Sequence, residues 1–185
     1  MGPVRTMIWL RSVASILALP TMVAAVVPWL LLRGGSEYGA FWSDPSAWRV
    51  GAAIVGAMFG CVGLALVTRT VWQFATVGRG TLAPWDPPER LVVKGVYRHV
   101  RNPMISGVWL ILLGELLVSA SATVLWWAVG FIVVNAVYIP LSEEPGLERR
   151  NGTEYRRYAA NVPRWVPRLS AWDPQERSSS TEAPN

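Results

Sequence analysis

The sequence has very little of what builds a metal or redox site. It contains one cysteine, Cys61, and one histidine, His99. One cysteine excludes an internal disulfide, and a single His with a single Cys cannot supply the several ligands of a protein zinc site. Cys61 lies among small apolar residues, which favours a packing role over a reactive thiol. We therefore expect no metal.

Familiar nucleotide-binding patterns are also missing. There is no P-loop, and no GxGxxG fingerprint follows a predicted strand. No alternation of strands and helices occurs either, so a soluble dinucleotide-binding fold is excluded. A Ser-His-Asp site would have to use His99, and no nucleophile elbow accompanies it.

Charge is scarce as well. Charged residues make up 16% of the 185 residues and hydrophobic residues 52%, whereas a soluble domain has about 25% charged residues. Eleven tryptophans fit a chain with rings at membrane–water boundaries. The formal charge of +5 invites nucleic acid as a partner, but the placement of the charges along the chain argues against it.

Four apolar runs predict the fold class. They cover residues 7–32, 50–67, 105–118 and 123–141. Crossing about 30 Å of hydrocarbon takes about 20 helical residues, so the third run needs its flanks to reach across. The sequence predicts an all-α integral membrane protein with about four transmembrane helices.

The basic residues predict the orientation. Fifteen of the 17 lysines and arginines lie near the start of the chain (Arg5 and Arg11), in loop 68–104, or after residue 141. Four crossings put these segments on one side, which the positive-inside rule makes cytoplasmic. We therefore expect both termini in the cytoplasm.

The connections predict how the helices are arranged. The short link at residues 119–122 makes the third and fourth helices an antiparallel hairpin, and the fourth helix should end at Pro140. Glycines in run 50–67 predict close helix packing. Residues 147–161 resemble an interfacial helix. We expect helices in residues 1–68, a catalytic region at 69–170 and a disordered tail at 171–185.

Two polar clusters flank the predicted hairpin. One is Tyr97-Arg98-His99-Val100-Arg101-Asn102-Pro103, and the other is Glu143-Glu144. The open ends of an antiparallel hairpin are neighbours, so we expect the basic cluster and the acid pair to meet at the cytoplasmic surface. They form either a functional site or an interfacial belt of salt bridges.

Glu115 is the acid inside a predicted crossing. An ionisable group within a membrane is expensive and is a functional candidate by default. It is either a catalytic group or a protonated carboxyl bonded to a neighbouring helix.

Residues 91–104, from Leu91-Val92-Val93 through Gly95 and Tyr97 to Arg101-Asn102-Pro103-Met104, resemble a signature of the isoprenylcysteine carboxyl methyltransferase and phospholipid methyltransferase family. A second block resembles the same family: Glu143-Glu144-Pro145-Gly146-Leu147, then Gly152, Tyr155 and Tyr158, then Val162-Pro163-Arg164-Trp165-Val166-Pro167. Together the two blocks span about half of the chain.

This resemblance implies a cytoplasmic pocket for S-adenosylmethionine, with S-adenosylhomocysteine as product. The implied cofactor-binding residues are Leu91, Val92, Tyr97, Asn102, Pro103, Met104, Ile105, Glu143 and Glu144. Arg101 would pair with the cofactor's carboxylate or brace one of the two glutamates. Asn102, Ile105 and Ile139 depart from the family pattern, and Ile139 replaces the arginine that would grip a prenylcysteine carboxylate.

We therefore predict methyl transfer to a membrane lipid or small hydrophobic acceptor, with Glu115 and Arg101 as candidate catalytic residues. An amine acceptor would need a base, which Glu115 could provide. Two alternatives remain: a nicotinamide-dependent membrane reductase with a similar helical end, and a non-catalytic membrane module.

Overall fold

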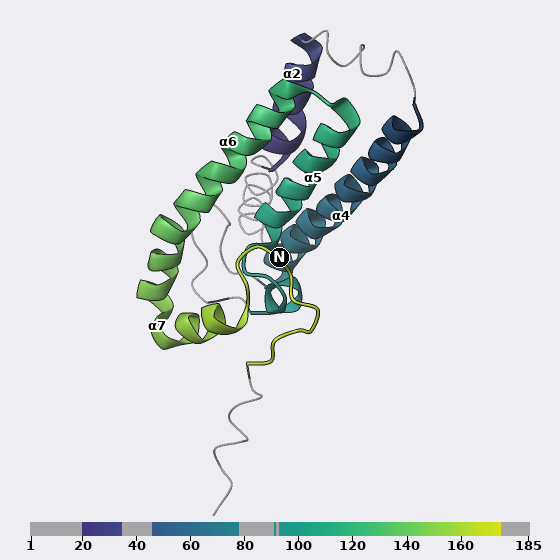
Figure 1. The fold of residues 1–185 in the computed structure, drawn as a ribbon. Helices are drawn as coiled ribbons and strands as arrows, with labels where there is room; N and C mark the ends of the chain where they lie inside the picture. The colour runs from purple at the N-terminus through teal and green to yellow at the C-terminus, as the bar shows by residue number, and fades with distance from the viewer. Residues whose placement is uncertain (1–19, 35–45, 78–90, 92, 175–185) are drawn as a thin grey trace, which may run out of the picture.

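The computed structural model describes residues 20–34, 46–77, 91 and 93–174. Every regular element in these residues is helical, so the all-α prediction is confirmed for this part of the chain (Figure 1). The elements are η1 (Met22–Val26), α2 (Val27–Gly34), α4 (Ala47–Val77), η2 (Gly95–Arg98), α5 (Pro103–Ser119), α6 (Ala122–Tyr138), η3 (Ile139–Glu143) and α7 (Glu144–Asn161).

Helices α4 and α5 approach each other through glycines. A Cβ atom placed on Gly63 would lie 2.5 Å from the carbonyl oxygen of Gly107, and one placed on Gly114 would lie 2.5 Å from that of Gly56. Glycines seven residues apart on each helix thus let the two backbones touch. The predicted glycine packing is confirmed at Gly56 and Gly63, whereas Gly51 faces open space.

Helix α4 extends beyond the predicted boundary. Its 31 residues continue to Val77, whereas the apolar run ends at Val67 and residue 68 was predicted to begin a loop. Hydropathy marks only the part of a helix that can lie in hydrocarbon, and α4 is about 46 Å long. Its last turns support η2, because Gln73 donates a hydrogen bond to the carbonyl oxygen of Lys94.

The predicted α5–α6 hairpin is confirmed. Helix α5 ends at Ser119, and Ala120 adopts the left-handed conformation with φ 48°. Ser121 then caps α6 by accepting a hydrogen bond from the backbone N–H of Val124.

A proline explains the wide turn η1. The N–H of Val27 bonds to the carbonyl oxygen of Met22, five residues back. The matching donor for Val23 would be Pro28, which has no N–H. The indole of Trp127 on α6 supplies that donor at 2.9 Å, so the freed carbonyl fastens this helix to α6.

Pro140 does not end the fourth helix, and that prediction is wrong. The chain passes Pro140 in the wide turn η3, where the N–H of Glu144 bonds to the carbonyl oxygen of Ile139. The turn absorbs the missing proline donor, and α7 follows directly. Within α7 the chain bends at Gly152, which has φ 53° and ψ −124°.

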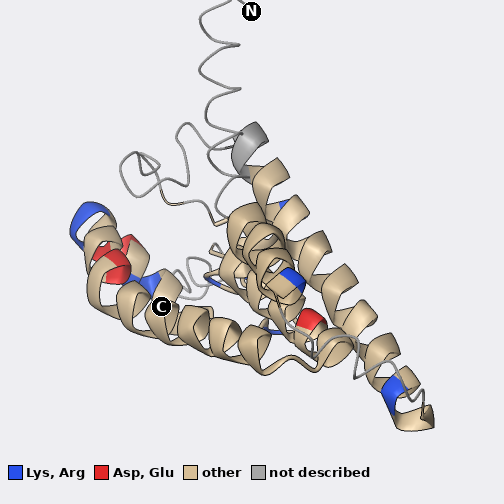
Figure 2. Cartoon of the chain, turned by 90° about the horizontal axis from the view of Figure 1, so that it is seen from above, with Lys and Arg blue, Asp and Glu red and all other residues tan. Residues whose placement is uncertain are grey.

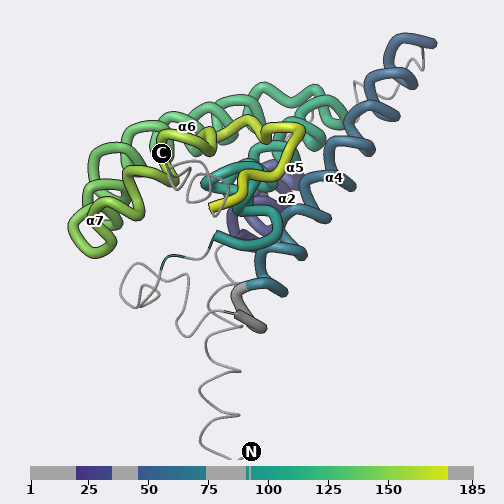
Figure 3. The backbone as a smooth tube through the Cα atoms, turned by 90° about the horizontal axis from the view of Figure 1, so that it is seen from below, coloured from purple at the N-terminus to yellow at the C-terminus, as the bar shows by residue number. Residues whose placement is uncertain are grey.

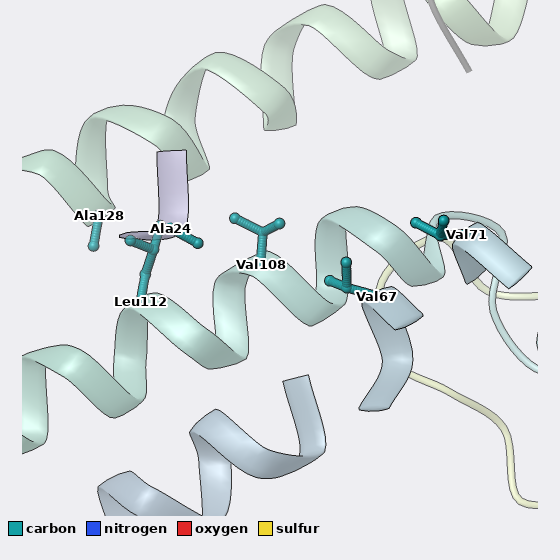
Figure 4. Packing of buried hydrophobic residues seen from close by; sticks show 6 residues of the cluster. All are labelled: Ala24, Val67, Val71, Val108, Leu112 and Ala128. Carbon is teal, nitrogen blue, oxygen red and sulfur yellow. The ribbon is translucent and has the colours of Figure 1, made fainter. Parts of the chain in front are cut away.

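The main apolar core joins four segments: Ala24 of η1, Val67 and Val71 of α4, Val108 and Leu112 of α5, and Ala128 of α6 (Figure 4). Two helical stretches, at Ala47–Gln73 and from Ala122 onwards, are long and apolar enough to cross a membrane. Met22–Gly34 and Pro103–Ser119 are shorter apolar helices. The largest group of charged positions in the described chain lies on α7 (Figure 2).

Candidate functional site

The chain after α7 folds back over the start of α5. We call residues 162–173 the strap (Figure 3). The backbone N–H groups of Arg101 and Asn102 donate to the carbonyl oxygens of Pro163 and Arg164, at 2.9 and 3.3 Å. The N–H of Arg168 in turn donates to the carbonyl oxygen of His99 at 3.0 Å. The strap thereby fixes the basic cluster.

The far end of the strap is fastened to the same cluster. Trp172 donates its backbone N–H to the carbonyl oxygen of Arg98 at 2.9 Å, and Arg98 returns a side-chain hydrogen bond of 2.5 Å to the carbonyl oxygen of Trp172. Arg98 also pairs with Asp173 at 3.1 Å. The Nδ1 atom of His99 donates to the carbonyl oxygen of Arg168 at 2.9 Å.

The predicted meeting of the basic cluster and the acid pair is confirmed. Glu144 forms a salt bridge of 3.1 Å with Arg101, and both side chains are nearly buried. Its two oxygens also accept two hydrogen bonds of 2.7 Å from Arg164 of the strap. This bond with Glu144 raises the pKa of Arg164. Two guanidinium groups therefore hold one carboxylate, and Arg101 braces Glu144.

Glu143 is placed differently. It is the last residue of η3 and remains exposed, and the salt bridges among the described residues do not include it. Partial desolvation by the surrounding chain, and then the charge of Glu144, raise the pKa of the Glu143 carboxyl, while Arg150 lowers it. Of the acid pair, Glu143 is the member that a ligand can reach.

The charge of Glu143 acts on the hydroxyl of Tyr97. Burial, followed by Tyr158 and Glu143, raises the pKa of Tyr97 well above its usual value. The hydroxyl of Tyr158 donates to the backbone oxygen of Tyr97 at 2.8 Å and fixes its position. The Tyr97 hydroxyl therefore stays protonated at neutral pH.

A second apolar core holds these residues in place. Tyr155, Tyr158 and Val162 are buried, and Leu91 and Trp172 pack against them. Burial, then the charge of Glu144, raises the pKa of Tyr155 to about 12, so its hydroxyl remains neutral and accepts a hydrogen bond of 3.3 Å from Arg101. Val92 lies outside the described residues.

The start of α5 completes the site. Its first backbone bond runs from the N–H of Ser106 to the carbonyl oxygen of Asn102, and Pro103 has no N–H. The N–H groups of Met104 and Ile105 therefore have no partner within the helix, which suits an anionic group. The side chain of Asn102 donates to the carbonyl oxygen of Arg164 at 3.3 Å.

Glu115 is far from this arrangement. It lies twelve residues beyond Pro103 on α5, which is about 18 Å along the helix. Its Oε2 atom is buried and has no hydrogen-bond partner among the described residues. An apolar groove of about 360 Å³, lined by Trp48, Ala52, Leu116, Leu117, Ala120, Ser121, Ala122 and Leu125, also lies at the hairpin end of the fold.

Sequence reasoning missed the contribution of Arg164, Ser106 and Trp165. Ser106 donates to the carbonyl oxygen of Trp165 at 2.9 Å, and the Trp165 ring lies 4.6 Å from that of Trp109. The prolines at 163 and 167 signal the end of the preceding helix. They do not indicate where the chain goes next.

Comparison with known proteins gives one match. A family model described as phospholipid methyltransferase matches residues 52–154, which include α5, α6, the acid pair and the basic cluster. No curated protein and no solved structure matches the chain.

Proposed function

The chain belongs to the phospholipid methyltransferase family, and from this premise we propose that it transfers a methyl group from S-adenosylmethionine to a lipid or other small hydrophobic acceptor at a membrane. The family and the two long apolar helices indicate a membrane protein and a methyltransferase. The cofactor, its pocket and the acceptor are the parts that we propose.

One observation carries the proposal: Arg101 and Arg164 hold Glu144 in an arrangement that we call the clamp, whereas Glu143, the residue before it, stays exposed. A carboxylate there suits the hydroxyl and ammonium donors of S-adenosylmethionine. The N–H groups of Met104 and Ile105, which have no partner within α5, suit its carboxylate. The residues present therefore fit a ligand that carries both kinds of group.

Glu143 and Glu144 have different roles in this proposal. Glu143 contacts the cofactor, and Tyr97, within range of its charge, adds a neutral hydroxyl and a ring. Glu144 is a positioning residue that ties α7, through Arg101 and Arg164, to the start of α5 and to the strap. Arg101 thus acts through Glu144.

When bound, S-adenosylmethionine would supply an activated methyl group on a sulfonium sulfur, for displacement by a nucleophilic atom of the acceptor. The protein's share of such a displacement is alignment and exclusion of water. Tyr97 and Glu143 hold the cofactor. The strap, which is bonded to Arg98 at the end of η2, covers the site. Glu115 lies about 18 Å along the helix from Pro103, so the proposal assigns it no chemical step.

We propose that α2, α4, α5 and α6 belong to crossing helices and that the site faces the cytoplasm. The charge pattern supports this orientation, because most of the 17 basic residues lie in segments on the side of the site. Both termini then lie in the cytoplasm. The acceptor enters sideways from the bilayer, and the cofactor enters from water.

Calorimetric titration of the detergent-purified protein with S-adenosylhomocysteine tests the proposal. Glu143→Gln and Tyr97→Ala should each weaken binding, the first by about 10- to 100-fold, since a hydrogen bond to a charged group contributes about 1.5–3 kcal/mol. Glu148→Gln is the matched control: that acid is also on the helical stretch after α6 but forms only a surface pair of 3.7 Å.

Absence of binding to a folded, monodisperse sample would contradict the methyltransferase proposal. Titration of the same sample with a reduced nicotinamide cofactor then separates a reductase from a non-catalytic module. If binding is unchanged in both Glu143→Gln and Tyr97→Ala, the protein binds the cofactor, but at a site other than the one proposed.

A further inference from the structure

The strap carries exposed apolar residues beside a helix that we assign to the membrane. The exposed fraction is 74% for Val166 and 102% for Leu169. Both follow Trp165, which packs on Trp109 of α5 at 4.6 Å between ring centroids. Trp109 lies six residues beyond Pro103, about 9 Å along the helix. This part of the strap therefore lies level with the second turn of α5.

The face of α5 under the strap continues as an apolar surface. Ser106 and Trp109 contact the strap, and Leu113 follows one turn after Trp109 on the same side of the helix. Leu113 has an exposed fraction of 37%. The strap contacts the first two turns of this face through Trp165 and leaves Leu113, on the next turn, exposed.

The part of the strap that precedes Val166 has its backbone oxygens bonded to the chain around the start of α5. Three consecutive carbonyl oxygens, those of Pro163, Arg164 and Trp165, accept hydrogen bonds from the start of α5. Pro163 and Pro167 have no N–H to satisfy. Irregular backbone is tolerated at membrane depth only where its polar groups are bonded in this way. The strap is therefore bonded to the start of α5 up to the residue that precedes Val166.

From this geometry we infer that the edge of the strap formed by Val166 and Leu169 is embedded in the bilayer, at the hydrocarbon boundary of the leaflet on the side of the site. Arg168 lies between the two apolar residues in the sequence. Its guanidinium donates hydrogen bonds to the carbonyl oxygen of Asn161 and to the hydroxyl of Ser170. The strap is then a wall between the site and the lipid, and it anchors the site at a fixed depth.

This inference goes beyond the proposed methyl transfer and depends only on the crossing of α5. Spin labelling in phosphatidylcholine vesicles tests it. Cys61, the chain's one cysteine, is exposed on α4, so Cys61→Ser provides a background for single labels. Val166→Cys and Leu169→Cys report the strap. Leu113→Cys reports α5, and Arg156→Cys, whose native side chain is 64% exposed on α7, reports water.

We expect the labels at residues 166 and 169 to collide more often with oxygen than with a water-soluble nickel complex, as at residue 113, and the label at 156 to show the reverse order. If 113 is lipid-exposed while 166 and 169 resemble 156, the strap faces water or a soluble partner, and the inference is overturned. If the label at residue 113 is itself exposed to water, α5 does not cross the bilayer, and the inference is overturned as well. Titration of the same vesicles with S-adenosylhomocysteine reports the proposed function separately.

Discussion

The guanidinium of Arg164 forms a bidentate pair with the carboxylate of Glu144, in which Nε and one terminal nitrogen each lie 2.7 Å from an oxygen. This pair joins two segments 20 residues apart, the start of α7 and the strap. Arg101 reaches the same carboxylate at 3.1 Å, at the oxygen that Nε of Arg164 also contacts. The position of Glu143, the preceding residue, therefore depends on a clamp that does not include it.

Loss of the clamp should cost stability and cofactor affinity together. We expect Arg164→Gln to lower the free energy of unfolding by about 1–3 kcal/mol, because a nearly buried carboxylate loses a charge-assisted pair. Arg164→Lys should recover only part of this loss, since an ammonium cannot bond in the same two-pronged way. Thermal unfolding in detergent measures the stability, and titration with S-adenosylhomocysteine measures the affinity.

Arg156→Gln is the control for this prediction. Arg156 pairs with Glu148 at 3.7 Å, and both side chains are largely exposed. Such surface pairs contribute about 0–1 kcal/mol, so stability and affinity should stay close to the parent values. Equal effects of the changes at 164 and 156 would show that the clamp has no special role.

The sequence predicts the crossings and the meeting of the two polar clusters because both follow from hydropathy and chain direction. A four-residue link between two apolar runs forces a hairpin, and a hairpin brings Arg101 and Glu144 to the same end. The apolar run ends at Val67, and hydropathy does not indicate whether a helix continues into the more polar residues that follow, which is why α4 beyond Val67 was missed.

The strap could not be predicted for a different reason. Its contacts are mainly bonds to backbone oxygens, which leave no side-chain pattern; Ser106 to the carbonyl oxygen of Trp165 is an example. Pro140 shows a third limit. A proline indicates that one backbone hydrogen bond of a helix is missing. Whether the helix ends there or continues through a wide turn such as η3 depends on how the neighbouring residues pack.

Close packing of α4 against α5 gives a second prediction. In Gly63→Ala the added Cβ would lie 2.5 Å from the backbone oxygen of Gly107, so the helices must separate. We expect a loss of about 1–3 kcal/mol in the free energy of unfolding, measured as a lower unfolding temperature in detergent.

Gly51→Ala is the matched control, because nothing lies within 4 Å of a Cβ at that position of the same helix. It should stabilise the protein by about 0.5–1 kcal/mol, as alanine favours helix over glycine. Destabilisation at both positions would argue against the glycine contact.

The bend in α7 gives a third prediction. Gly152, with φ 53° and ψ −124°, adopts a conformation that other residues rarely enter. Gly152→Ala should cost about 1–3 kcal/mol through backbone strain alone, since its Cβ would meet nothing within 4 Å. Gly146→Ala, equally open and in the helical part of α7, should leave the unfolding temperature unchanged or raise it.

The raised pKa of Glu143 gives the fourth prediction, in which stability and binding change in opposite directions with pH. Between the usual pKa of glutamate and the raised one, the folded protein binds more protons than the unfolded chain. The free energy of unfolding of the ligand-free protein therefore falls as pH rises through this window. Affinity for S-adenosylhomocysteine should rise through the same window, because only the ionised carboxylate accepts hydrogen bonds at both oxygens.

Glu143→Gln removes the contribution of this carboxyl to both dependences and should stabilise the ligand-free protein near neutral pH, since no charge is then desolvated at that position. Unfolding temperatures recorded with and without S-adenosylhomocysteine, from about pH 4 to pH 7, measure both effects in one series. Parallel pH profiles for the parent and the glutamine variant would show that Glu143 titrates outside this window. If only the affinity profile became flat, Glu143 would still contact the cofactor, and its desolvation would arise on binding rather than in the free protein.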